Sequence, residues 1–140
     1  MTDPITALGG AAAATQFIAC GIKICQVMCR IYGKVDDAPA RVRDQIQQVE
    51  EMVSIVGLVE RNSALQVDPQ ISSILDRCLS RAKKIQDRLK LVSIADRDGR
   101  MRKLKKNVSA VFNEKEIAAM LEDLERWNGL LIIRIENVDV

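Results

Sequence analysis

The spacing of apolar side chains along the chain predicts helices. Over about residues 39–61, 69–92 and 114–136, aliphatic side chains recur every three or four positions. This period places the apolar positions on one face of an α-helix. The first of these segments is rich in valine, which favours strands, but a 3–4 period sustained over five turns outweighs that propensity. All three segments are therefore predicted to be amphipathic helices.

The N-terminal segment is predicted to be a helix that is apolar around most of its circumference. Asp3 and Pro4 combine an N-cap residue with a proline at the first helical position, and Gly33 is a suitable stop. The polar side chains of its second half form one narrow stripe: Gln16, Lys23 and Arg30. We expect a helix over about 4–32 that needs burial on most of its sides.

The remaining segments are short. Residues 62–68 are predicted to be a connector, and Asp68-Pro69 repeats the cap-then-proline signal. Residues 93–99 break the period, and Asn113 and Glu116 stand at capping-box spacing before the last helix. A short basic helix between them has this apolar line: Met101, Leu104, Val108 and Val111. Four long helices plus one short helix predict an all-α, up-and-down bundle that forms a single domain over residues 1–140.

Composition argues against enzyme activity. Hydrophobic residues make up 48% of the chain and charged residues 29%, which is an ordinary globular balance, whereas aromatic residues are only 3%. Histidine is absent, which excludes His-based acid–base catalysis, Ser–His and Cys–His pairs, and His-containing metal sites. The sequence has no phosphate-binding loop, and residues 96–99 do not fit a calcium loop. We expect no catalytic residue, no cofactor and no bound metal.

The four cysteines are expected to be reduced. Cys25 and Cys29 share a helix face, whereas Cys20 points about 140° away from Cys25, an arrangement that suits neither chelation nor a disulfide set. We interpret these three thiols and Cys78 as small apolar side chains of the core, which suits a cytoplasmic protein.

Charge is strongly segregated along the chain. The net charge is +2, but it is +2 over residues 1–35, −5 over 36–76, +9 over 77–106 and −4 over 107–140. Three interpretations of the basic block, residues 77–106, are left open: a solvated helix face, a contact for anionic lipids, and a contact for an acidic partner. The candidate contact residues are Arg100, Arg102, Lys103, Lys105 and Lys106. Nucleic acid is disfavoured because no aromatic side chains are interleaved with these cations.

The first helix carries two further features. From Pro4 to Ile22 it has 19 residues without a charge, which as a helix would be about 29 Å long and close to one bilayer core. A ladder of small side chains runs along it: Ala7, Gly10, Ala11, Ala14, Thr15 and Ala19. Such ladders allow helices to approach closely, either inside a soluble bundle or in a membrane.

Several stretches resemble the HeLo-like N-terminal domains of fungal NLR-like STAND proteins. The opening MTDPITALG, the alanine-rich run and Gln16-Phe17 are similar to the start of those domains, while residues 36–98 match only in helix layout. Similar C-terminal stretches are residues 102–105, 114–117, 121–126 and 128–131. Lys23, Arg30 and three cysteines depart from the pattern in the second half of the first helix.

The resemblance implies a role in fungal incompatibility or regulated cell death. In that family the domain is the N-terminal effector module of a larger receptor, and it oligomerises and then targets and permeabilises membranes. Carried over to this chain, the inserting element is Pro4 to about Ile22. Its apolar side chains are Pro4, Ile5, Leu8, Phe17, Ile18 and Ile22. The resemblance also implies a cytoplasmic protein recruited conditionally to the plasma membrane.

Two functional hypotheses follow from the sequence. In the first, the domain acts on membranes: its first helix is covered in the resting bundle and released on activation, and the partners are further copies and anionic lipids. In the second, the domain is a protein–protein interaction module that self-associates or recruits other signalling proteins without a membrane step, as its alternating block charges suggest.

Overall fold

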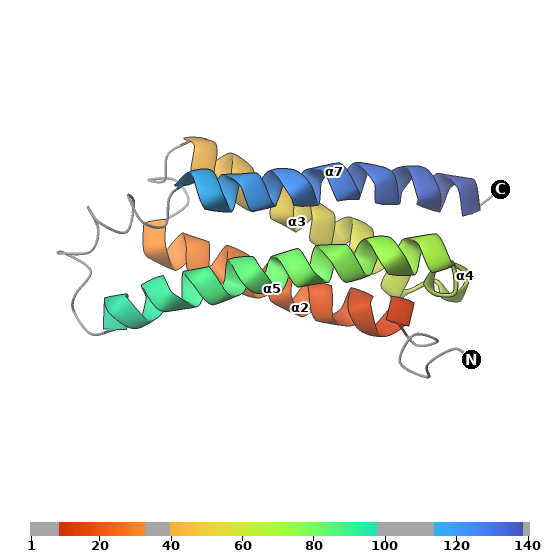
Figure 1. Cartoon of the computed structure of the whole chain (residues 1–140), viewed down its shortest axis with the longest axis horizontal. Coiled ribbons are helices and arrows are strands. Elements are labelled where there is room, and N and C mark those ends of the chain that lie inside the picture. The colour runs from red at the N-terminus through yellow and green to blue at the C-terminus, as the bar shows by residue number, and fades with distance from the viewer. Residues whose placement is uncertain (1–8, 33–39, 98–113, 139–140) are drawn as a thin grey trace.

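The computed structural model describes residues 9–32, 40–97 and 114–138, and all its long elements are helices (Figure 1). The described helices are α2 (Gly9–Tyr32), α3 (Ala40–Glu60), α4 (Ser63–Gln66), α5 (Pro69–Arg97) and α7 (Glu114–Val138). No strand occurs within these ranges. The all-α prediction is confirmed, with four long helices and one short one among the described residues.

The long helices alternate in direction and form a bundle (Figure 1). α2 lies against α3 and α5, and α7 lies against the same two helices. α2 and α7 therefore occupy opposite corners of the bundle, and so do α3 and α5. Since α3 and α5 are consecutive long helices at diagonal corners, the chain has to cross one end of the bundle between them. The crossing segment contains α4, which contacts all four long helices.

Several helix boundaries differ from the sequence-based predictions. The stretch 62–68 was predicted to be a connector but contains α4, whose N-cap Asn62 accepts a hydrogen bond from the Ala64 amide at 3.0 Å. α5 continues past residue 92 to Arg97, and the first glycine or proline after Pro69 is Gly99. The predicted helix residues 4–8, the stop at Gly33, the short basic helix and Asn113 lie outside the described residues.

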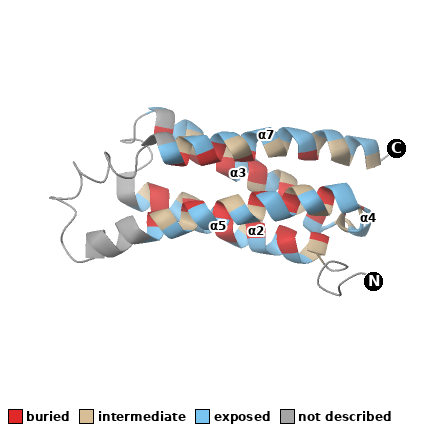
Figure 2. Ribbon diagram, viewed as in Figure 1, coloured by how far each residue is buried: buried red, intermediate tan, exposed pale blue. Residues whose placement is uncertain are grey.

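The core is aliphatic, as the composition predicts. Each long helix carries buried positions along part of its surface (Figure 2). Its largest fully buried side chains are Phe17, Ile24, Met28, Ile71, Leu75, Ile85, Leu89, Leu121 and Leu131. Leu65 of α4 is also buried and closes the core at the end where the chain crosses it. Burying one such side chain contributes about 1.5–3 kcal/mol, so the apolar faces account for the association of the helices.

Candidate functional site

α2 is a core helix with one exposed face. Its buried side is formed by Gly10, Ala13, Ala14, Phe17, Cys20, Gly21, Ile24, Val27 and Met28. Its exposed face is formed by Ala12, Thr15, Gln16, Ala19, Ile22, Lys23, Gln26 and Arg30. The polar stripe noted in the sequence therefore belongs to the solvent side, where small side chains accompany it.

The residues predicted to enter a membrane lie on different sides of α2. Phe17 has no exposed surface, Ile18 is half-buried, and Ile22 is 47% exposed. Pro4, Ile5 and Leu8 lie outside the described residues. The bulkiest of these side chains in the described range, Phe17, is thus covered by the bundle in this state.

The ladder of small side chains also divides between two faces. Gly10 and Ala14 are buried and Ala11 is half-buried, whereas Thr15 and Ala19 are exposed; Ala7 lies outside the described residues. A Cβ atom added at Gly10 would lie 2.1 Å from the Gln66 carbonyl oxygen. Close packing in the bundle, one of the two interpretations left open by the sequence, thus accounts for the buried part of the ladder.

A second close contact on α2 involves Gly21. A Cβ atom added there would lie 2.5 Å from Cγ2 of Val53 on α3. Real Cβ atoms essentially never come this close to a non-bonded atom. Glycine at this position therefore leaves room for the Val53 side chain against α2, and any larger residue would require the valine or the helices to move.

At the end of the bundle that carries α4, hydrogen bonds join the end of α3 to α2 and to α4. Thr15 Oγ1 donates to Glu60 Oε2 at 3.1 Å, which links α2 to the end of α3. Gln66 Nε2 donates to the carbonyl oxygens of Val59 and Glu60 at 3.1 and 2.7 Å. The Val59 carbonyl oxygen also accepts from the Asn62 amide at 3.2 Å, so Gln66 adds to the capping of the last turn of α3.

Asp68 and Arg134 form the strongest polar contact at this end. Arg134 Nε lies 3.2 Å from each Asp68 oxygen, and its terminal nitrogen lies 2.8 Å from Oδ2, so the pair is bidentate. Asp68 Oδ1 also accepts from the amides of Gln70 and Ile71 at 3.0 Å, which confirms the predicted helix cap. The Arg134 guanidinium and these amides hold the pKa of Asp68 below its ordinary value.

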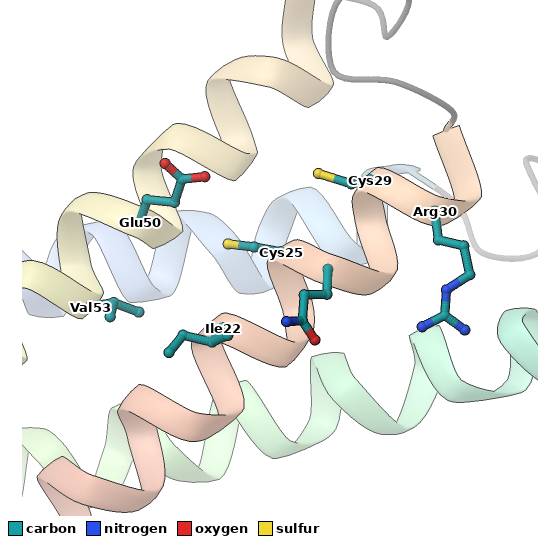
Figure 3. A pocket seen from close by; sticks show the side chains of 7 residues that line it. Ile22, Cys25, Cys29, Arg30, Glu50 and Val53 are labelled. Atoms are coloured by element: carbon teal, nitrogen blue, oxygen red, sulfur yellow. The ribbon is translucent and has the colours of Figure 1, made fainter.

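A groove of about 650 Å³ lies between α2 and α3 (Figure 3). Ile22, Cys25 and Cys29 line it from α2, and Glu50 and Val53 line it from α3. Both thiols point toward α3, whereas the Arg30 side chain points toward α5 (Figure 3). This volume lies within the range of small-molecule sites in proteins, about 300–1,000 Å³.

The four thiols differ in their surroundings. Cys78 is fully buried, and burial raises its pKa to about 12; Cys20 is buried too and donates to Gln86 Oε1 at 2.9 Å. Cys25 and Cys29 are half-buried. Burial, together with the nearby Glu50 carboxylate and the second thiol, raises the pKa of Cys25 to about 11. Cys20 and Cys78 are thus inside the core, as expected, whereas Cys25 and Cys29 pack against it from its edge.

The predicted contact residues from Arg100 to Lys106 lie outside the described residues. Two cations of the neighbouring α5 pair with α7: Arg81 with Asp123 at 3.3 Å and Arg88 with Glu116 at 2.6 Å. Arg81 also lies over the Trp127 ring, 5.6 Å from its centre. These side chains join α5 to α7. Among the α5 side chains that the structure describes, residues 69–90, the exposed cations are Arg77, Lys83, Lys84 and Lys90.

Sequence reasoning missed the contacts that hold α2 in place and the groove beside it. Gly21 gave no signal as a close-approach site, and Asp68 and Arg134 are 66 residues apart. The shared face of Cys25 and Cys29 was the one feature of the groove visible in the sequence. In the described part of the chain, no three acidic, cysteine or histidine side chains are grouped so as to hold a metal ion.

α2 is also the one described helix that is long and apolar enough to cross a membrane. The stretch Gly9–Arg30 has a mean hydropathy of 1.4, and half of the residues in its most apolar window are buried in the bundle. These are properties of length and composition, and core helices of soluble proteins share them. Comparisons with protein families, curated proteins and solved structures find no match for this chain.

Proposed function

We propose that this chain is a non-enzymatic signalling domain that acts by oligomerisation and membrane targeting through α2. The observation that carries the proposal is the contrast between α2 and the other helices. α2 has no charge from Gly9 to Ile22, yet Phe17, the bulkiest side chain of that stretch, lies inside the bundle. The resemblance to HeLo-like domains of fungal cell-death receptors supports the same function.

The energetics of α2 suit two environments. Phe17 is fully buried in the bundle, and a bilayer core would bury the same ring. The main cost of insertion is Lys23, because a charge at the centre of a membrane helix costs about 2.5–3.5 kcal/mol. A span from Pro4 to Ile22 avoids that cost, since Lys23 then lies at the interface, where its long side chain reaches water.

In the resting state the bundle opposes this transfer. The contacts of Gly21 with α3 and of Thr15 with Glu60 exist only while α2 is packed. An activating event has to lower the free energy of the released state by more than these contacts and the burial of α2 stabilise the packed state. Self-association and anionic lipids, met by the basic residues from Arg100 to Lys106, are the partners that we propose.

A reversible disulfide between α2 and α3 tests the proposal. The pair Gly21→Cys and Val53→Cys places two cysteines where Gly21 of α2 meets Val53 of α3, in a background whose four native cysteines are replaced by alanine or serine. Dye release is measured from anionic and neutral liposomes. The chain is fused to an inducible oligomeriser, because a resting monomer with α2 packed would release no dye even if the proposal is correct.

We expect leakage from the reduced form and none from the oxidised form, with preference for anionic liposomes. The two single-cysteine variants under the same oxidant are the matched controls, and both should leak. A chain without residues 1–22 should be inactive. Equal leakage from the oxidised and reduced forms, or no leakage from any forced oligomer, would refute the membrane mechanism.

A specific charge pattern favours a second candidate, a protein–protein interaction module without membrane activity. Exposed residues of α3 include Asp44, Glu50 and Glu51, whereas those of the diagonally opposite α5 include Lys83, Lys84 and Lys90. Opposite charges on opposite corners suit head-to-tail association of copies. Sedimentation without lipid, at low and high salt, distinguishes this module by salt-sensitive assembly.

A further inference from the structure

The two half-buried thiols lie together in the α2–α3 groove. Cys25 and Cys29 are four residues apart on one face of α2, and both side chains point toward α3 (Figure 3). Ile22 and Val53 add apolar surface beside them. The groove therefore combines a place for an aliphatic group with two sulfur atoms that can bind it covalently.

The other two cysteines provide a comparison within the same chain. Cys20 and Cys78 are buried in the core, and neither lines the groove. Both fit the role of small apolar side chains. Cys25 and Cys29 pack against the edge of the core, where Cys25 Sγ donates to the Ile46 carbonyl oxygen at 3.8 Å, and both also border a space of about 650 Å³.

We propose that Cys25 and Cys29 are sites of reversible S-acylation by a long-chain fatty acid, and that the groove holds the attached chain while α2 is packed. The acyl donor is a long-chain acyl-coenzyme A. The cysteine sulfur attacks the thioester carbonyl, a new carbon–sulfur bond forms, and the bond to coenzyme A breaks. The cysteine proton ends on the coenzyme A thiol, so the reaction balances without an oxidant or reductant.

The surroundings of Cys25 favour acylation by a transferase over direct reaction with acyl-coenzyme A. Burial and the nearby Glu50 carboxylate raise the pKa of this thiol, so little thiolate is present at neutral pH. A transferase supplies the base that removes the proton. Cysteines on amphipathic or membrane-adjacent helices are a common substrate of such enzymes.

The modification would strengthen membrane anchoring once α2 is released. Each buried methylene contributes about 0.8 kcal/mol, and a single chain anchors a protein only marginally, so stable anchoring needs a second signal. An inserted α2 would be that second signal. This role in anchoring rests on the proposed function, whereas the thioester itself and its place in the groove do not.

Metabolic labelling tests the inference directly. The full chain is expressed in eukaryotic cells fed with an alkyne analogue of palmitate, and the label is read on the purified protein before and after hydroxylamine, which cleaves thioesters. The test variants are Cys25→Ser/Cys29→Ser and Cys25→Ala/Cys29→Ala. The matched control is Cys20→Ser/Cys78→Ala, and circular dichroism verifies that each variant is folded.

We expect hydroxylamine-sensitive label on the unmodified sequence, at least a tenfold loss in both test variants, and a change of less than twofold in the control. Absence of such label on the unmodified sequence, or its persistence in the folded test variants, would overturn the inference. Labelled protein that never permeabilises liposomes contradicts only the proposed membrane function. Leakage by a chain that carries no label contradicts only the acylation.

Discussion

Replacing Gly21 by alanine measures how closely α2 lies against α3. The added Cβ would lie 2.5 Å from Val53 Cγ2, so the helices or the valine have to move. Overpacking of this kind costs about 1–3 kcal/mol. Alanine also has a helix propensity about 1 kcal/mol better than that of glycine, which offsets part of the cost. The free energy of unfolding should therefore fall by up to about 2 kcal/mol relative to the unmodified chain.

Gly129 is the matched control for this substitution. It lies within α7, and a Cβ atom added there would meet nothing within 4 Å. Gly129→Ala should therefore show only the propensity gain, up to about 1 kcal/mol of added stability. The difference between the two variants, about 1–3 kcal/mol, then measures packing alone.

Urea denaturation followed by circular dichroism gives both free energies. In a double-mutant cycle, Val53→Ala removes the atom that the new Cβ would meet, so Gly21→Ala should cost much less in that background. A gain in stability from Gly21→Ala equal to that from Gly129→Ala would refute the close approach of α2 and α3.

Three further predictions concern single side chains. Phe17→Ala should lower the free energy of unfolding by about 3–5 kcal/mol, measured by urea denaturation, because the ring is fully buried; a loss below 1 kcal/mol would contradict its burial. The pKa of Asp68 is lower in the folded chain than its ordinary value of 3.8, so its stabilising contribution should be complete above pH 3.8 and be lost as the pH falls through the folded pKa. Asp68→Asn should flatten this part of the curve of unfolding free energy against pH. An unchanged curve would argue against the pairing of Asp68 with Arg134. An alkylating reagent should modify Cys25 and Cys29 in the folded chain, but Cys20 and Cys78 only after unfolding, as read by mass spectrometry. At pH 8, Cys25 should react about 100-fold more slowly than a thiol of pKa 9.0, because its own pKa is about 11.

The sequence predicts the long helices well because their signal is local. The 3–4 spacing of Val42, Ile46 and Val49 needs no knowledge of the partner helices, and each of these side chains is buried. The cap at Asp68 was predictable for the same reason, since its hydrogen bonds go to residues two and three positions away.

The features that position α2 are not predictable in this way. α4 is a single turn, too short to show a period, so only Asn62 hints at its start. The pairing of Asp68 with Arg134 depends on which helix ends meet, and that is decided by the chain crossing the bundle diagonally. The groove beside Cys25 likewise depends on the distance between two helices, which no local pattern contains.

The diagonal placement of α2 and α7 has a consequence for assembly. Since α3 and α5 both pack against α2, its departure exposes the parts of their apolar faces that α2 covers and leaves an open trough between them. The element that fits this trough is α2 itself, from the same chain or from another copy. Any condition that frees the helix therefore also creates an acceptor for it, and domain-swapped dimers or open chains of exchanged helices become an expected product.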